Sequence, residues 1–381
     1  MVPKETVEKA LREIRDELLQ NLKELVELES PSDDKEAVHR AAEKVVEQFS
    51  SYYSNSKVLG EEGKVYIINP DTGVLFIGHV DTVHPVGTLE KNPFRIVNNK
   101  IYGPGVLDMK AGFVVLLGAL KILEKMGNSP PPISLLINTE EEIGSPRTLT
   151  SMKKAARKAK MCLSLEPSGE GGKLKTRRKG VAALKLEAWG RETHAGLAPE
   201  KGINAIEEVI YQAKRIKEWA SQQGFSFNLG VIRGGSRANV VPGYCEALID
   251  IRHDEDKFAS IFKEYEELLE PRTPGARVAL SVQSFVPPLN PSEKSRMLYS
   301  KLKEIGSELG MEIDEVYSGG GSDASWFSHW GVPTVDGLGP EGRGEHSPEE
   351  HLFLDSFMER IVFITFVLLR MQELLQIEEG S

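Results

Sequence analysis

Cysteine is scarce in this sequence, and no long apolar run occurs. The two cysteines among 381 residues, Cys162 and Cys245, are too few for a disulfide framework, which indicates a reducing environment and a cytoplasmic protein. The longest apolar run, at 361–369, is interrupted by Thr365 and is too short to span a bilayer. The first 28 residues are amphipathic and rich in charge, without the apolar core of a signal peptide. We therefore expect neither export nor a membrane partner.

Positive charge is also in deficit. Lysine and arginine number 47 against 57 aspartates and glutamates, which gives a net charge of −10. This balance argues against nucleic acid as a partner. One basic run does occur, with Lys173, Lys175 and the cations at 177–179, and we interpret most of it as a solvated linker face. With 40% hydrophobic and 27% charged residues, the chain is expected to be globular and to form about two domains.

Helical and strand patterns alternate over roughly the first 170 residues. Nearly all-apolar runs at 74–80, 133–138 and 161–165 predict buried strands, and the apolar segment 110–126 predicts a helix that is covered on most faces. Alternation of this kind is typical of a mixed, mostly parallel α/β sheet with helices on both faces. We therefore expect this architecture for the main domain.

The pattern changes between about residue 180 and residue 288. The expected order is strand, helix, strand, strand, helix, strand, which is the βαββαβ order of a ferredoxin-like domain. The corresponding segments are 181–189, 203–222, 227–232, 244–252, 254–269 and 277–285. We therefore expect a catalytic domain formed by 1–178 and 289–381, into which a domain of residues 179–288 is inserted.

The first pattern returns near the C-terminus and ends in a long helix, expected at about 355–375. Just upstream, Ser347, Pro348 and Glu350 form a capping-box pattern. We therefore predict that these three residues start the last helix.

Polar side chains follow the predicted strands. His79 and Asp81 come at the end of strand 74–80, where residues two apart share one face. Asp81 can then accept the second ring N–H of His79 and leave the other ring nitrogen free for a metal ion. A surface pair is the alternative interpretation of such a His-x-Asp pattern. The nearby His84 is interpreted as a structural residue.

Four further candidate ligands occupy comparable positions. Asp108 ends a Gly/Pro-rich loop, and Glu142 belongs to an acidic run after a strand. Glu166 follows another strand, and His346 precedes the last helix. A helix cap and a solvated acidic loop are the alternative interpretations of the first two. Ligands bind at the edge where parallel strands end. Together with His79, these four residues make two histidines and three carboxylates, a set that suits two zinc ions with one bridging carboxylate.

The segments around these residues resemble the co-catalytic zinc aminopeptidase–carboxypeptidase–deacylase superfamily. That superfamily contains glutamate carboxypeptidase, aminoacylase, acetylornithine deacetylase and succinyl-diaminopimelate desuccinylase. The sequence looks most like the branch of the folate-hydrolysing glutamate carboxypeptidase. The matching segments lie at 78–83, 103–112, 141–145, 165–167, 193–196 and 319–324.

The resemblance implies a role for each candidate ligand. His79 and Glu166 would complete one zinc site, and Glu142 and His346 the other. Asp108 would bridge the two ions, and a cis peptide bond would follow it. Cobalt or manganese could substitute for zinc, because sites with nitrogen and oxygen ligands accept several metals.

Three further residues receive catalytic roles from the resemblance. Glu141 would be the general base on the metal-bound water, and Asp81 would hold His79. His194, in the inserted domain, would polarise the scissile carbonyl. Because the inserted domain of this family often dimerises, the resemblance implies a homodimer formed mainly by residues about 180–288. In it, His194 would act across the interface or after domain closure.

The resemblance also implies residues at the substrate end of the site. Lys173 matches a lysine that helps to hold the substrate carboxylate in the folate-type enzyme, and Asn239, Arg252 and Gly320 would line the same end. The folate-type enzyme has a carboxylate-binding arginine just beyond the last strand of the inserted domain, whereas this sequence has Phe-Val-Pro-Pro-Leu at 285–289. Specificity for a C-terminal glutamate is therefore left open, with Arg252 as an alternative carboxylate clamp.

The expected activity is that of a metallohydrolase that cleaves a peptide or amide bond adjacent to a free carboxylate. Its substrate would be a small molecule or a short peptide. An N-acyl-amino-acid deacylase is the alternative, because both reactions break an amide beside a carboxylate. A zinc-containing binding protein without catalysis is a remote alternative, since Glu141 and all five ligands are present.

Overall fold

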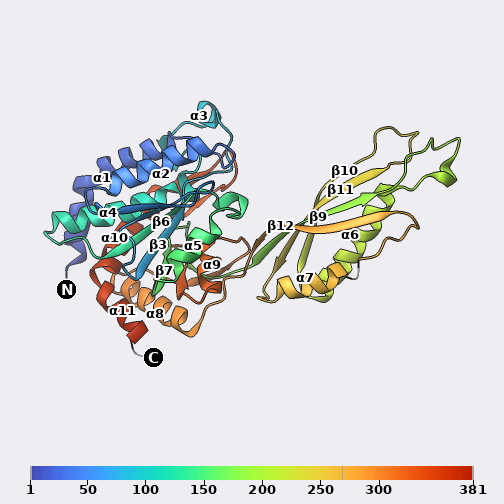
Figure 1. Ribbon diagram of the computed structural model, residues 1–381. Coiled ribbons are helices and arrows are strands. Elements are labelled where there is room, and N and C mark those ends of the chain that lie inside the picture. The colour runs from blue at the N-terminus through green and yellow to red at the C-terminus, as the bar shows by residue number, and fades with distance from the viewer. Residues whose placement is uncertain (1, 268, 380–381) are drawn as a thin grey trace. The chain divides into compact units, whose positions relative to one another are not determined.

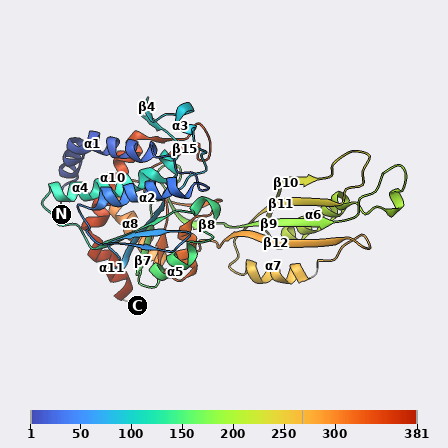
Figure 2. The same cartoon turned by 45° about the horizontal axis from the view of Figure 1, so that its top comes forward.

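The computed structural model describes residues 2–267 and 269–379 of the chain. These residues form two compact units (Figure 1, Figure 2). Unit 1 runs from the N-terminus to Arg177 and continues through Leu289–Ser318 and from Ser322 onward. Unit 2 comprises Arg178–Pro288 together with Gly319–Gly321. None of the described helices is long and apolar enough to cross a membrane.

A six-stranded sheet forms the centre of unit 1. Its strands are Ser56–Leu59 (β1), Val65–Ile68 (β2), Val74–His79 (β3), Ile133–Asn138 (β6), Met161–Ser164 (β7) and Thr334–Val335 (β14). Their order is β1-β2-β6-β3-β7-β14. β6, β3, β7 and β14 run parallel to one another, whereas β2 pairs antiparallel with both of its neighbours, β1 and β6. The mostly parallel sheet predicted from the sequence is therefore confirmed.

Helices cover both faces of this sheet (Figure 1). The core on one face includes Lys4–Val26 (α1), Lys35–Phe49 (α2), Ala111–Lys125 (α4), Glu293–Glu308 (α8) and Leu354–Leu369 (α10); the core on the other includes Leu149–Ala156 (α5) and Asp323–His329 (α9). α4 is apolar on most sides because α1 and α10 also pack on it. A Cβ at Gly118 would lie 3.0 Å from Ile361 and 3.1 Å from Leu18, so glycine lets these helices approach closely.

The single C-terminal helix predicted at 355–375 is wrong. The chain forms α10 and then Met371–Glu379 (α11), with a break at Arg370. The guanidinium of Arg370 donates hydrogen bonds to Glu304 and Glu308 of α8 and to Glu373. These contacts with a neighbouring helix favour a change of direction that the apolar pattern alone does not reveal.

The capping-box prediction upstream of that helix is also wrong. A strand, His351–Phe353 (β16), directly precedes α10. The hydroxyl of Ser347 donates to the carbonyl of Gly344 within a tight turn, so it does not cap a helix. Glu350 is fully buried and contacts a distant loop, as described below.

Smaller elements complete unit 1. One small sheet has the order β15-β16-β5-β4, and a second pairs β13 with β8. Their strands are Gly342–Arg343 (β15), β16, Lys100–Tyr102 (β5), Arg95–Val97 (β4), Glu315–Ser318 (β13) and Leu174–Arg178 (β8). Short helical segments lie at Thr88–Lys91 (α3), Val106–Lys110 and Glu141–Ile143.

Unit 2 has the βαββαβ order predicted for a ferredoxin-like domain, which is confirmed. Its elements are Gly180–Trp189 (β9), Ala205–Gln222 (α6), Ser226–Gly234 (β10), Tyr244–His253 (β11), Phe258–Glu267 (α7) and Arg277–Val286 (β12), with a short turn at Pro199–Lys201. The antiparallel sheet has the order β10-β11-β9-β12. Alternate residues of β9 and β11 are buried in a core that α6 and α7 share, as the two-residue period of a strand requires.

Candidate metal centre

Three neighbouring strands of the main sheet end in polar residues. β3 ends at His79, which pairs with Asn138 at the end of β6, and β7 ends at Ser164 beside them. Glu141 and Glu142 follow β6, and Glu166 follows β7. Because these strands are parallel, the side chains that follow them meet at one edge of the sheet.

Two more candidate ligands come from loops of the small sheet. β5 leads into the loop that carries Asp108, and the β15–β16 hairpin carries His346. The pairing of β16 with β5 brings these loops side by side. The peptide bond between Asp108 and Met109 is cis, as the resemblance implies.

The five candidate ligands lie close together and form two groups. Nε2 of His79 lies 3.2 Å from Oδ1 of Asp108 and 3.4 Å from Oε1 of Glu166. Nε2 of His346 lies 3.3 Å from Oδ2 of Asp108 and 3.1 Å from Oε2 of Glu142. The two carboxylate oxygens of Asp108 therefore face different histidines.

Asp81 is fully buried and organises the acidic turn. Nδ1 of His79 lies 2.9 Å from the backbone carbonyl of Asp81 and 3.5 Å from its carboxylate. The carboxylate accepts the amides of Glu141 and Glu142, each at 3.1 Å, and the hydroxyl of Ser32 at 2.8 Å. The backbone carbonyl of Asp81 and its carboxylate thus both face His79, and the carboxylate also fixes the turn that carries Glu141 and Glu142.

The electrostatics of the cluster favour a cation. Hydrogen bonds to Asp108, then to Glu142, raise the pKa of His346 to about 11. Burial raises the pKa of Asp108, but His346 and His79 outweigh it and hold this pKa far below its usual value. Without metal, protonated imidazoles therefore balance the carboxylates. Ligand atoms of His79, Asp108 and Glu142 lie within 4.8 Å of one another, and imidazole with carboxylate is a donor set that suits zinc.

Glu141 differs from its neighbours in its surroundings. Oε2 of Glu141 lies 3.9 Å from Nε2 of His79. Burial raises the pKa of Glu141 well above its usual value, although the charge of His79 opposes this. A carboxylate with a raised pKa beside a group of candidate metal ligands has the property that a general base requires.

Glu350, His84 and Asp323 lie near the cluster but were not identified as site residues from the sequence. Glu350 accepts hydrogen bonds from backbone amides of the Asp108 loop and contacts His84. Asp323 is buried and accepts from Asn138 at 2.5 Å and from Ser145 at 2.7 Å. Their contacts span long separations in sequence. Asp323 lies within the matching segment 319–324, which was the one local signal for it.

Lys173 belongs to unit 1, in the turn before β8. Its backbone pairs with Gly169, and its charge lowers the pKa of Asp314, after the stronger effect of Lys303. These contacts do not join Lys173 to the cluster.

His194 and Asn239 lie together in unit 2. The amide of Ala195 donates to the carbonyl of Asn239 at 2.9 Å, and His194 bridges to Val240. Nδ1 of His194 accepts the amide of Gly196 at 3.1 Å, so the neutral ring carries its proton on Nε2. The exposed imidazole therefore offers an N–H donor.

Arg252 and Gly320 lie elsewhere in unit 2. Arg252 forms two parallel hydrogen bonds with Asp250, at 2.8 and 2.9 Å, and the carbonyl of Gly320 accepts from Arg178. Arg252 pairs with Val181 at the start of β9, whereas His194 follows the end of that strand. The structure thus separates the two groups by roughly 27 Å along β9.

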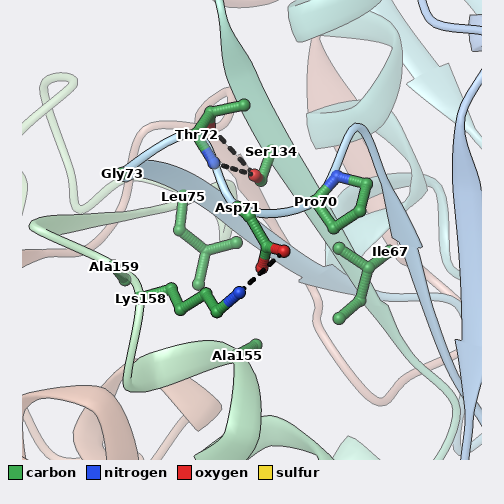
Figure 3. A pocket seen from close by; sticks show the side chains of 10 residues that line it. All are labelled: Ile67, Pro70, Asp71, Thr72, Gly73, Leu75, Ser134, Ala155, Lys158 and Ala159. Carbon is green, nitrogen blue, oxygen red and sulfur yellow. Dashed lines mark hydrogen bonds and ion pairs between the residues drawn. The ribbon is translucent and has the colours of Figure 1, made fainter.

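A small cavity at the other edge of the main sheet is not a substrate site. Figure 3 shows its lining, in which Lys158 pairs with Asp71 at 2.9 Å. Gly73 and Ser134 place it near the starts of β3 and β6, opposite the cluster. Its volume of about 20 Å³ suits a water molecule and no larger ligand.

A mostly parallel sheet with imidazoles and carboxylates gathered where its strands end is an architecture typical of metal-dependent hydrolases. The model of peptidase family M20/M25/M40 matches residues 75–370. The chain belongs to this family of metallohydrolases, and the protein is a hydrolase. The family is metal-dependent and typically uses zinc.

Individual relatives carry several names. Carboxypeptidase G2 from a Pseudomonas species is 30% identical over 364 residues, which cover 90% of this chain and 86% of that protein. Succinyl-diaminopimelate desuccinylase from Wolinella succinogenes is 28% identical over 275 residues, 68% of this chain and 74% of that protein. The crystal structure of human carnosine dipeptidase 1 has a TM-score of 0.72 at 16% identity, covers 98% of this chain and 100% of its own, and supports the fold alone.

We expect zinc binding to the metal-free protein to release protons at neutral pH. Asp108 and Glu142 raise the pKa of His346 to about 11, so its imidazole carries a proton that zinc must displace. Zinc affinity should therefore rise with pH below that value. Calorimetry in buffers of different ionisation enthalpy counts the protons, and the His346→Ala variant should release fewer. Binding to the wild type without net proton release would contradict this expectation.

Proposed function

We propose that this chain is a two-zinc hydrolase that cleaves a peptide or amide bond next to a free carboxylate. The observation that carries the proposal is the geometry of Asp108. Its Oδ1 faces His79 and its Oδ2 faces His346, so one carboxylate can bridge two ions. The remaining ligands divide accordingly, with Glu166 beside His79 and Glu142 beside His346.

The chemistry divides between the ions and the protein. Bound zinc would polarise the scissile carbonyl and lower the pKa of the attacking water to about 7; cobalt or manganese are candidate substitutes. Glu141 would take a proton from the attacking water and deliver it to the leaving nitrogen. The carboxylate of Asp81 would keep Glu141 close to the attacking water by accepting the backbone amide of Glu141.

The general-base role is tested by Glu141→Gln. The carboxamide cannot accept the proton, while the five ligands stay intact, so kcat should fall by roughly 10²–10⁴-fold with both metals retained. Steady-state kinetics and metal analysis of the purified variant measure the two effects. Glu345→Gln is the matched control, because Glu345 is exposed and neighbours His346. A Glu141→Gln variant with at least about a tenth of wild-type kcat would remove Glu141 from this role.

The substrate class is narrowed by the relatives and by Arg252. The relatives include a carboxypeptidase and a desuccinylase, so both peptide and acyl-amide substrates are candidates. Asp250 already engages two nitrogens of Arg252, which leaves Nη1, near the carbonyl of Gly319 at 3.4 Å, for a substrate carboxylate. Asn239, Gly320 and Lys173 are the other candidate contacts.

An N-acyl-amino-acid deacylase is the second candidate function. One observation favours it: residues 285–289 offer no arginine just beyond the last strand of unit 2. The similarity to a succinyl-diaminopimelate desuccinylase is consistent with it.

A substrate panel distinguishes these functions. The panel would contain folate-like glutamates, dipeptides, and N-acetyl and N-succinyl amino acids, each also as its carboxamide. We expect every hydrolysed substrate to lose at least about tenfold in kcat/KM as the carboxamide, because a charge-assisted hydrogen bond contributes about 1.5–3 kcal/mol. Carboxamides cleaved as fast as carboxylates would contradict the requirement for a free carboxylate. The fastest member identifies the class.

We also propose a homodimer formed through unit 2. β10 is an edge strand, and its Leu229 and Ile232 are exposed, as is Ile210 of α6. An exposed apolar edge strand is a template for pairing with a second copy. A cytoplasmic location, expected from the scarcity of cysteine, stays a prediction.

The separation within unit 2 supports a shared site. Arg252 and His194 lie at opposite ends of β9, roughly 27 Å apart, which exceeds the length of a small substrate. One copy of unit 2 therefore cannot offer both residues to one substrate molecule. In a two-fold dimer, each site can combine Arg252 of one chain with His194 of the other.

Subunit exchange tests this arrangement. His194→Ala and Glu141→Gln should each be nearly inactive, because each lacks one part of the reaction machinery. Mixed dimers would hold one site with both residues intact, so an equimolar exchanged mixture should regain about a quarter of wild-type activity. Native mass spectrometry verifies the exchange. No recovery after complete exchange would mean that His194 serves its own chain.

A further inference from the structure

The carboxylate of Glu350 is buried in a nest of backbone amides. Its Oε1 accepts the amides of Leu107 at 2.8 Å and Asp108 at 3.0 Å. Its Oε2 accepts the amide of Gly105 at 2.8 Å and lies 2.6 Å from Nε2 of His84. Both oxygens are therefore fully used, and the side chain has no exposure to solvent.

The nest depends on the local backbone. Gly105 has a φ of +68°, in the left-handed region that favours glycine, and a Cβ there would lie 2.5 Å from Thr82. The chain turns at this point, and the amides that follow point inward towards Glu350. Three neutral backbone amides therefore hold the carboxylate together with His84.

Glu350 joins the two loops that carry candidate ligands. It follows His346 by four residues and binds the amide of Asp108 itself. His346 has a φ of +62°, a conformation that a residue other than glycine keeps only when its surroundings hold it. The amide of Glu350 also donates to the carbonyl of Ser347, which closes the turn after His346.

We propose that Glu350, held by His84, is a positioning residue that fixes Asp108 and His346 in their metal-binding arrangement before metal arrives. It touches neither metal nor substrate, and it acts through the backbone of Asp108 and the turn after His346. This inference rests on the proposed metal-binding role of those two residues. It accounts for a buried carboxylate and a buried histidine that the proposed reaction does not use.

Glu350→Gln tests the proposal with little change of shape. The amide group keeps one acceptor oxygen, but its NH₂ must face backbone N–H donors, either that of Gly105 or those of Leu107 and Asp108. Metal affinity, measured by competition with a chromogenic chelator, should fall roughly 10–100-fold, as for other residues that orient metal ligands. In the metal-loaded enzyme kcat should fall while KM stays within about twofold, because Glu350 does not contact substrate.

Hydrogen exchange of the metal-free protein supplies a readout that does not depend on activity. In Glu350→Gln, the amides of Gly105, Leu107 and Asp108 should exchange at least about tenfold faster, while those of α4 stay unchanged. Glu349→Gln is the matched control, because Glu349 is the exposed neighbour and should leave every readout unchanged. His84→Gln, which keeps a donor, should lose less metal affinity than His84→Ala.

The outcomes separate this inference from the proposed function. Wild-type protein that binds metal, beside a folded Glu350→Gln variant with unchanged affinity and exchange, would overturn only the positioning role. Asp108→Asn that leaves metal binding intact would overturn the proposed function. If Glu350→Gln does not fold, the variants His84→Gln and His84→Ala provide the test. Equal metal affinity of His84→Ala and wild type would overturn the positioning role. A small loss of affinity in His84→Gln and a larger loss in His84→Ala would support it.

Discussion

The structure depends on one electrostatic constraint, which is that several buried or half-buried carboxylates lie close together near the ends of the parallel strands. Asp108, Glu142 and Glu166 approach two imidazoles at 3.1–3.4 Å. Like charges this close repel strongly in a medium of low dielectric constant. The arrangement is therefore stable only when positive charge balances it, as protons on His79 and His346 or as bound cations. The topology creates this demand for cations, because it delivers an acidic residue from each neighbouring strand to one edge.

The carboxylates around the cluster meet this demand in a different way. Asp81, Asp323 and Glu350 are buried, and they accept hydrogen bonds from backbone amides, hydroxyls and a side-chain amide, with a histidine beside Glu350. Such donors orient a carboxylate while adding little positive charge to the cluster. Arginine or lysine partners in the same places would weaken the attraction for a metal ion. These three anchoring carboxylates thus fix the geometry of the cluster, and the negative potential at the candidate ligands is preserved.

The sequence predicts what local patterns encode. The apolar strands, their parallel arrangement and the candidate ligands that follow β3, β6 and β7 are all encoded by residues close together in the chain. Glu350 could not be predicted, because its partners lie more than 240 residues away and its Ser-Pro-x-Glu context is typical of a helix start. The break at Arg370 was missed for the same reason, since contacts with α8 accompany it. The carboxylate of Asp81 faces His79 at 3.5 Å, as expected, but it also accepts amides of a turn that only the folded sheet brings near.

Metal loading in such a protein differs from that of a small zinc domain, which is unfolded without metal. Large apolar cores on both faces of the sheet stabilise unit 1 independently of the cluster. The ligand loops are tied by anchors that need no ion, Asp81 for the acidic turn and Glu350 for the loop of Asp108. The free energy of folding therefore offsets the repulsion between the gathered carboxylates, and protons balance their charge. In the proposed site, a cation would replace the proton of His346, so affinity would depend on pH and on how firmly these anchors hold the loops.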